Sequence, residues 1–311
     1  MRVTFSTNLH VDDSPTEIVP SGTTYSWGAP VSSPVGAITG GSAADDQTSI
    51  SQTLTNTTGE PATLTYTVTP DANGCKGDGF DVVITVNPNG QVNAIADQTL
   101  CNGDSTLAVS FATTNTGAGT TTYNWTNNNT AIGLASNGTG DISSFTATSS
   151  AVAPIVGNIT VTPVYTYNDV SCTGTAETFS ITVNPSPLVN FSEADQVIVT
   201  GETTTSVDLT SPTSGVTFAW TVSVPTGITG VTTLTGTDNI PAETLINSTT
   251  GPLDVVYTAI ATGDVGFDCE GLPTDYTVTV NPQAQVNPVD DQVVCNDENL
   301  EIGRASCRER V

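Results

Sequence analysis

Short runs of alternating hydrophobic and polar residues dominate the chain. In the run ATLTYTVT at 62–69, Leu64, Tyr66 and Val68 fall on one face of an extended strand and threonines fall on the other. Such alternation is typical of a half-buried strand in an antiparallel sheet, because successive side chains point to opposite faces. Further along, the pattern predicts strands near 106–112, 120–127, 141–148, 156–167 and 177–185, with an edge strand near 91–100. Gly, Asn and Asp turns separate them, which favours a β-sandwich.

The same pattern returns with a period of 97 residues. The string ITVNPNGQVNAIADQ at 84–98 is echoed by ITVNPSPLVNFSEADQ at 181–196 and by VTVNPQAQVNPVDDQ at 278–292. A period of this length matches one small domain rather than a solenoid unit. The prolines Pro88, Pro185 and Pro282 stop strand pairing and stiffen each short linker, which predicts a rod of tandem sandwiches. The expected domains are 1–88 (truncated at its N-terminus), 89–185, 186–282 and the start of a fourth at 283–300.

Composition agrees with an all-β fold and sets one segment apart. Charged residues make up only 12% of the chain, and threonine, which favours strands, is abundant. Residues 301–311, EIGRASCRERV, hold three of the five basic side chains. This string matches a sequencing adapter codon for codon, so we interpret it as a translated adapter and exclude it from the fold. A natural basic tail is the alternative.

The net charge of −26 restricts the partners that the chain can have. Such an acidic surface repels phosphate backbones and anionic lipids, so we expect neither nucleic-acid binding nor membrane insertion. The first residues carry no signal segment, and no run of about twenty apolar residues occurs. The chain is therefore either cytosolic or a fragment of an exported protein whose ends are missing, and we favour the fragment.

Each repeat contains one tryptophan in a strand-like run, with another aromatic residue two positions earlier. These tryptophans are Trp27, Trp125 and Trp220. A tryptophan can stack on a sugar ring, as in carbohydrate-binding modules. Because each shares its strand face with an aromatic partner in the same repeat position, the core of a sandwich is the favoured location.

Longer strings from all three repeats resemble a known family. SWGAP…ISQTLTNTT…YTVTP…C…ITVNP, ADQTLCNGD…YNWTNNNTAIGLASNGTGDISSFTAT…CTGTAETFSITVNP and FAWTVSVPTGI…IPAETLINSTT…YTVTVNP are similar to PKD-like, immunoglobulin-like repeats. Such repeats occur in large secreted and surface proteins of Bacteroidota, several of which carry gliding-motility or type IX secretion sorting domains. The resemblance implies an all-β fold of tandem sandwiches and an adhesive or spacer role. It brings no catalytic residues.

Candidate chemistry is sparse. Catalysis needs a general base, a nucleophile or a metal. The single histidine, His10, lies in an irregular acidic stretch, and the single lysine, Lys76, lies in a turn. Zinc-type spacing, a phosphate loop and a nucleophile elbow are all missing from the sequence. We therefore expect no catalytic residues and no enzyme activity.

Acidic pairs offer a weak alternative chemistry. Calcium takes six to eight oxygen ligands, and loops between sandwich domains can supply them. The best candidates for such a calcium site are Asp290 and Asp291, beside the third linker. The favoured interpretation of these two residues is nevertheless the ordinary one, in which aspartate side chains cap turns. Calcium is thus the one cofactor that the sequence does not exclude. The other acidic sites considered are Asp12, Asp13, Asp45, Asp46, Asp78 and Asp81.

The cysteines suggest export. In an immunoglobulin-like sandwich the first strand can run parallel beside the last one, which places the starts of both at the same end. On that basis we expect a disulfide between Cys101 and Cys172 within the second repeat. Cys269 is then expected to be unpaired, because Val199 occupies the early position of the third repeat. The remaining cysteines are Cys75 and Cys295, whose partners lie outside the fragment, and Cys307 in the tail. Reduced thiols in a cytosolic protein are the alternative.

These features together favour a non-catalytic segment of an extracellular or cell-surface protein that acts as an adhesive stalk or spacer. The expected partners are surface glycans or other surface proteins, and no oligomer is predicted. A carbohydrate-binding accessory region of a larger secreted enzyme is the alternative. It requires solvent-exposed aromatic side chains.

Overall fold

A computed structural model describes residues 2–4, 19–263, 268–284 and 296. In this part of the chain every regular element is a β-strand except η1 (Thr130–Ile132), one 3₁₀ turn. The all-β expectation is therefore confirmed. The chain divides into two compact units. The first is Met1–Asn190 with Thr210–Ala219 and Ile260–Thr274, and the second is Phe191–Leu209 with Trp220–Ala259 and Asp275–Val311.

The first sheet is built around one long strand. That strand, β8 (Ala62–Ala72), buries Leu64, Tyr66 and Val68 on one face, as the alternation in the sequence predicts. The sheet order is β10 (Phe80–Val86), β8, β2 (Thr24–Trp27) and β5 (Ala44–Gln47), and β3 (Val31–Ser33) and β9 (Cys75–Lys76) also pair with β8. Two short pairs accompany it: β1 (Arg2–Thr4) with β6 (Ser49–Ser51), and β4 (Ile38–Thr39) with β7 (Thr55–Asn56).

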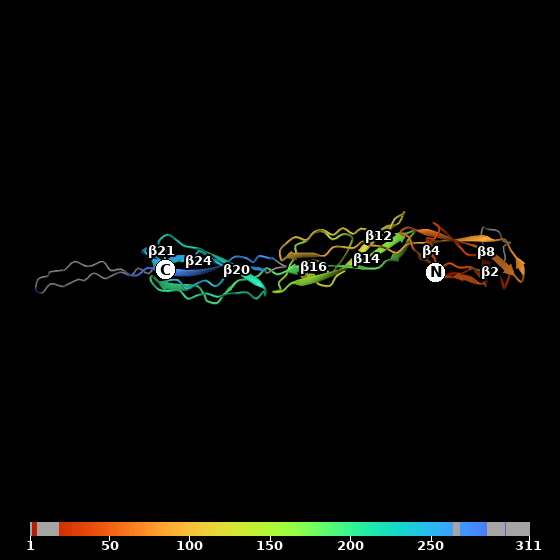
Figure 1. The fold of residues 1–311 in the computed structure, drawn as a ribbon. Helices are drawn as coiled ribbons and strands as arrows, with labels where there is room; N and C mark the ends of the chain where they lie inside the picture. Colours follow the sequence, from red (N-terminus) through yellow and green to blue (C-terminus); the bar gives the residue numbers. More distant parts are fainter. Residues whose placement is uncertain (1, 5–18, 264–267, 285–295, 297–311) are drawn as a thin grey trace. The chain divides into compact units, whose positions relative to one another are not determined.

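The second sheet repeats this plan, and Figure 1 shows β12 and β14 side by side within it. Its order is β11 (Gln98–Cys101), β16 (Glu177–Asn184), β14 (Ile155–Tyr167), β12 (Thr120–Asn127) and β13 (Asn137–Thr139), with β15 (Val170–Thr173) on β14. Hydrophobic residues from β12, β14 and β16 form its core together with Val109, Ile132 and Ile142.

Two of the strands expected in the second repeat are not regular strands. The backbones of residues 105–112 and 141–148 pair through two isolated β-bridges, Val109 with Ile142 and Ser105 with Thr146, and not through a continuous ladder. Side chains replace part of the ladder here: Thr106 Oγ1 accepts from the N–H of Phe145 at 3.0 Å. Threonine hydroxyls and aspartate carboxylates compete with backbone pairing in this way. The alternation of hydrophobic and polar residues does not reveal this competition.

The third sheet has the order β18 (Gln196–Val199), β25 (Thr274–Asn281), β24 (Leu253–Gly263), β20 (Val216–Ser223) and β22 (Thr235–Gly236). Two short pairs complete this part of the chain: β17 (Asn190–Phe191) with β19 (Leu209–Thr210), and β21 (Ile228–Thr229) with β23 (Ile246–Asn247). The last strands of the three sheets, β10, β16 and β25, end at or directly before the Asn-Pro pairs at 87–88, 184–185 and 281–282. The domain boundaries themselves remain a prediction.

Each tryptophan lies in a core. Trp27, Trp125 and Trp220 are 5%, 7% and 3% exposed. Each indole nitrogen also donates to a backbone carbonyl oxygen, of Ser42, Gly140 and Asp238 respectively. Buried tryptophans whose N–H groups are satisfied are structural, and they offer no ring face to a sugar.

Candidate functional site

In the second and third repeats, the first strand lies parallel to the last strand of the same repeat. In the second repeat Gln98 lies opposite Ile181 and Cys101 lies opposite Asn184. In the third repeat Gln196 lies opposite Val278, and Val199 lies opposite Asn281. This is the equivalent pairing, 98 residues later in the first strand and 97 residues later in the last strand. The sequence motif Ala-Asp-Gln precedes or begins both strands.

The aspartate of this motif caps the neighbouring strand. Asp97 Oδ1 accepts from the N–H of Ser180 at 2.6 Å, and Asp195 Oδ1 accepts from the N–H of Thr277 at 2.9 Å. The carboxylate thus satisfies a backbone donor of the last strand just before parallel pairing begins. A hydrogen bond to a charged acceptor is stronger than one between neutral groups, so the motif helps to fix the register.

The glutamine ties the first strand to the opposite layer of the sandwich. Gln98 accepts from the N–H of Leu107 at 2.9 Å and donates to the carbonyl oxygen of the same residue at 3.1 Å. Gln196 makes the same two bonds to Thr205, at 2.9 Å and 3.1 Å. A side-chain amide therefore substitutes for a strand partner twice in the chain.

The register places Cys101 at the far end of β16. The following residue, Asn102, donates its N–H to the carbonyl oxygen of Asn184 at 2.8 Å. Asp104 Oδ2 accepts from the N–H of Cys101 at 3.1 Å and closes the turn. Cys101 is therefore held against the linker that follows Asn184.

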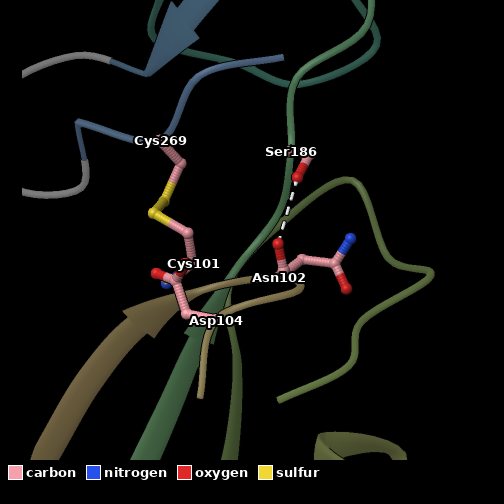
Figure 2. The surroundings of a disulfide bond; sticks show 5 residues. All are labelled: Cys101, Asn102, Asp104, Ser186 and Cys269. Carbon is pink, nitrogen blue, oxygen red and sulfur yellow. Dashed lines mark hydrogen bonds between the residues drawn. A yellow bond between two sulfur atoms is a disulfide. The ribbon is translucent and has the colours of Figure 1, made fainter. Parts of the chain in front are cut away.

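Cys101 forms a disulfide with Cys269 (Figure 2), with the two Cα atoms 5.6 Å apart and 168 positions apart in sequence. Cys269 is 1% exposed. Beside the bond, Ser186 Oγ donates to the carbonyl oxygen of Asn102 at 3.5 Å. The bond joins a cysteine of the second repeat to a cysteine of the third, and thereby fixes this junction covalently.

The expected disulfide between Cys101 and Cys172 is therefore wrong, as is the expectation that Cys269 is unpaired. The parallel arrangement of first and last strands was correct, but Cys101 ends its strand rather than beginning it. Cys172 lies in β15, before β16 starts, whereas Cys101 lies beside the end of β16. Eight residues of strand separate those ends by roughly 25 Å, while a disulfide needs Cα atoms within about 7 Å.

A close backbone contact supports the junction. A Cβ atom added at Gly271 would overlap the carbonyl oxygen of Pro187, a linker residue. In the corresponding place 97 residues earlier, a Cβ atom at Gly174 would overlap the carbonyl oxygen of Gly90. Each late glycine, two residues after a cysteine, therefore lets the backbone of one repeat approach the linker closely.

The first junction has these contacts without a disulfide. Asn87 donates its side-chain amide to the carbonyl oxygens of Tyr167 and Val170 at 3.0 and 3.1 Å. Gly90 donates its N–H to the carbonyl oxygen of Cys172 at 3.1 Å. The Cys172 thiol is free and half-buried.

The acidic candidates show no sign of a metal centre. Asp45, Asp46, Asp78 and Asp81 are exposed, and Lys76 is exposed as well. Within the described residues, no group of three or more His, Cys, Asp or Glu side chains is arranged to hold a metal ion. Several further candidates lie outside the described residues: His10, Asp12, Asp13, Asp290, Asp291, Cys295 and Cys307.

One buried polar site was not singled out from the sequence. Glu243 is 4% exposed, and its Oε2 accepts from the Tyr257 hydroxyl at 2.8 Å. Burial raises the pKa of Tyr257, and the hydrogen bond to Glu243 raises it further. In the first repeat, Gln52 Oε1 accepts from Tyr66 in the same way at 2.7 Å. The sequence holds a signal for this site, because Gln52 and Glu243 begin two similar strings, QTLTNTTG at 52–59 and ETLINSTTG at 243–251.

Solved structures with similar chains include fragments of cadherin-23 and of titin. Extracellular repeats 22–24 of mouse cadherin-23 match with 13% identity over 87% of this chain and 89% of that one, at a TM-score of 0.30. A three-immunoglobulin-domain fragment of titin matches with 11% identity over 85% and 89%, at a TM-score of 0.35. No curated protein sequence matches the chain.

The family comparison is more specific. The PKD-like domain matches residues 4–90 and 196–284, which together make up more than half of the chain. These stretches contain the first and third sheets, with their buried tryptophans and their Asn-Pro ends. No helix in the described part is long and apolar enough to cross a membrane. The chain therefore belongs to the PKD-like domain family, as tandem immunoglobulin-like β-sandwich repeats.

Proposed function

We propose that the chain is a non-catalytic segment of an extracellular or cell-surface protein, where it serves as an adhesive stalk or spacer. An origin among the surface proteins of Bacteroidota, and the rod-like arrangement that the sequence predicts, belong to this proposal. The observation that carries it is the junction at Cys101 and Cys269. A covalent bond and a close backbone contact at a linker transmit load between repeats better than a free linker does.

The disulfide also supports the proposed location. Disulfides form and persist in oxidising compartments and are rare in cytosolic proteins, where thiols are kept reduced. Cys101 and Cys269 are bonded. Export to the cell surface or beyond accounts for such a bond more simply than a reducing cytosol does.

Surface glycans or surface proteins are the proposed partners, and calcium at Asp290 and Asp291 stays a proposal. The alternative function, a carbohydrate-binding accessory region, would use a surface groove. A groove of about 550 Å³ lies beside the first junction. Amide and hydroxyl side chains and the carboxylate of Glu177 line this groove. Its lining contains no aromatic ring for stacking on a sugar. The stalk is therefore the favoured function.

Single-molecule extension of the whole chain from both ends tests the load-bearing role. With the disulfide intact, the sequence between Cys101 and Cys269 cannot extend. Reduction should therefore add roughly 600 Å of contour length, from 168 positions at about 3.6 Å each. Discrete unfolding steps before and after reduction support a stalk. A chain that extends smoothly at low force, without steps, would contradict it.

A further inference from the structure

A buried carboxylate holds an exposed loop of the third repeat. The loop, residues 231–234, runs from β21 to β22, and Thr232 and Thr233 in it are exposed. Glu243 is 4% exposed, and its Oε2 accepts from the Tyr257 hydroxyl in the core. Its Oε1 accepts from the N–H of Thr232 at 2.6 Å, from the hydroxyl of Thr232 at 2.9 Å and from the N–H of Thr233 at 3.2 Å. One side chain thus joins the loop to the core of its repeat.

The contacts of Glu243 suit its ionised form. An ionised carboxylate is an acceptor only, and it makes stronger hydrogen bonds than a neutral carboxyl group does. After protonation, the Tyr257 hydroxyl can turn and accept the new proton, but the backbone N–H groups of Thr232 and Thr233 can only donate. The backbone of Glu243 is held separately by Thr204, whose Oγ1 accepts from the Glu243 N–H at 2.9 Å. Protonation therefore weakens the attachment of the loop while Glu243 itself stays in place.

Glu243 is the group at this site that changes its charge between neutral and acid pH. It contacts Tyr257 on β24, whose ring centroid lies 6.3 Å from that of Tyr276 on β25. Burial raises the pKa values of Tyr257 and Tyr276, so both keep their protons at neutral and acid pH. Asp195 and Glu193 act on Tyr276, which lies behind Tyr257. The basic residues of the described ranges belong to other strands and are Arg2 on β1 and Lys76 on β9.

The first repeat has a counterpart of this site. A Cβ atom added at Gly40 would overlap the carbonyl oxygen of Thr53, and one added at Gly230, just before the loop, would overlap that of Thr244. Glu243 directly precedes Thr244, and a glutamine takes the corresponding place before Thr53. The two sites therefore share their backbone geometry and differ in the side chain that holds the loop.

A neutral amide holds the corresponding loop of the first repeat. Gln52 accepts from the N–H of Ser42 at 3.0 Å and donates to the carbonyl oxygen of Ser42 at 2.8 Å. Gln52 Oε1 also accepts from the Tyr66 hydroxyl, as Glu243 accepts from Tyr257. An amide does not titrate between neutral and acid pH, so the attachment of Ser42 should not depend on pH. Glutamate in place of glutamine makes the loop of the third repeat the pH-dependent one.

The loop leads directly into an edge strand of the third sheet. This strand, β22, has two residues, Thr235 and Gly236, and Gly236 lies opposite Trp220 on β20. A Cβ atom added at Gly236 would overlap the Trp220 ring, so this glycine lies flat against the indole. So short a strand has little stability of its own. Freeing the loop should therefore loosen β22 and uncover the ring of Trp220.

We propose that Glu243 is an acid-released latch. Ionised, its carboxylate fastens residues 231–234 and, through them, β22 to the third repeat. Protonated, it releases the loop, and the edge of β20 becomes accessible together with the Trp220 ring. An open strand edge can pair with another strand. The third repeat is thus closed at neutral pH and receptive to an added strand at acid pH, and this does not depend on the stalk role.

Hydrogen exchange of the whole chain, resolved to single amides and indole N–H groups, tests the latch. The protection factors of Thr232 and Thr233 should fall at least roughly tenfold between about pH 7 and about pH 3, which lies below the usual pKa of a glutamate. The indole N–H of Trp220 should lose protection over the same range. The N–H of Ser42 is the internal control, because Gln52 holds it, and its protection factor should stay unchanged.

Glu243→Gln is the matched variant, because it introduces the side chain that the first repeat has at this place. Its amide oxygen can accept from the loop, and its amide NH₂ group can donate to the Tyr257 oxygen. We expect the protection of Thr232 and Thr233 in this variant to be the same at both pH values.

Three outcomes would overturn the proposal. The first is equal protection of Thr232 and Thr233 at both pH values in the parent chain. The second is a parallel loss of protection at Ser42, and the third is an equally large loss in Glu243→Gln. The comparison with Ser42 is made in the parent chain, so the test remains decisive even if Glu243→Gln fails to fold.

Discussion

Cys269 is bonded to Cys101, 168 positions earlier, although Cys172 lies much closer to Cys101 in sequence. The bond crosses from one repeat to the next because a first strand ends at the linker that follows its own repeat. The late cysteine of the next repeat lies at the same linker. The partner of a cysteine is therefore decided by its position along its strand. It is not decided by the repeat to which the cysteine belongs.

Replacing Cys101 with serine should destabilise the chain. A disulfide limits the conformations of the unfolded chain, and for 168 positions the chain-entropy model gives about 5 kcal/mol. We expect urea unfolding, followed without reductant, to shift to lower urea in Cys101→Ser and Cys269→Ser alike. Cys172→Ser is the matched control, and its midpoint should stay near that of the parent. Equal midpoints in all three variants would show that the bond contributes nothing.

A methyl group at the close linker contact should disturb the junction. Gly271→Ala places a Cβ atom against the carbonyl oxygen of Pro187, and the backbone has to move to relieve the overlap. We expect a loss of about 1–3 kcal/mol, the usual cost of overpacking, measured by thermal unfolding. Gly28→Ala is the control, because a Cβ atom there meets nothing within 4 Å. A parent-like Gly271→Ala would contradict the close approach.

Asn247 begins Asn-Ser-Thr, a string of the Asn-x-Thr type that accepts N-linked glycans, but its role should be structural. Its side-chain amide donates to the carbonyl oxygens of Gly251 and Val280, both at 2.8 Å, and its Oδ1 accepts from Thr249. Asn247→Ala leaves these buried groups unsatisfied, so we expect a loss of about 1–3 kcal/mol in urea unfolding. Asn137→Ala, at an exposed position, should change the midpoint little. Intact mass after expression in a glycosylating host should show Asn247 unmodified; a glycan there would contradict the assignment.

Stability should fall at alkaline pH, and Tyr257 should contribute to the fall. Burial, and then the hydrogen bond to Glu243, raise the pKa of Tyr257 in the folded chain. In the unfolded chain a tyrosine loses its proton near pH 10. The stabilisation is therefore complete below about pH 10 and is lost as the pH rises from there towards the folded pKa.

Tyr257→Phe separates this effect from general alkaline unfolding. At about pH 8 the variant should be less stable by about 1–3 kcal/mol, because Glu243 stays buried without its partner. Between about pH 8 and about pH 11 its urea midpoint should fall less steeply than that of the parent. Some decline should remain, because burial also raises the pKa values of Tyr66 and Tyr276. Parallel curves for the two proteins would contradict the role of Tyr257.

The regular part of the fold follows from the sequence because it depends on local patterns. Alternation located β8, and the strand expected at 120–127 coincides with β12 (Thr120–Asn127). The irregular layer at 106–112 and 141–148 was not predictable in this way, because side chains such as Thr106 replace its ladder. The disulfide was missed because its prediction required knowing at which end of its strand Cys101 lies. That position is set by the register of the parallel pairing between β11 and β16, which the pattern of residues does not give.

Because the bond between Cys101 and Cys269 crosses repeats, a single repeat is not a chemically complete piece of this protein. A fragment cut at Pro88 and Pro185 would carry two cysteines, Cys101 and Cys172, that face opposite ends of the sandwich and cannot satisfy each other. Such a fragment would be prone to scrambled cross-links during refolding. The smallest piece suited to recombinant work therefore contains both repeats that share the bond.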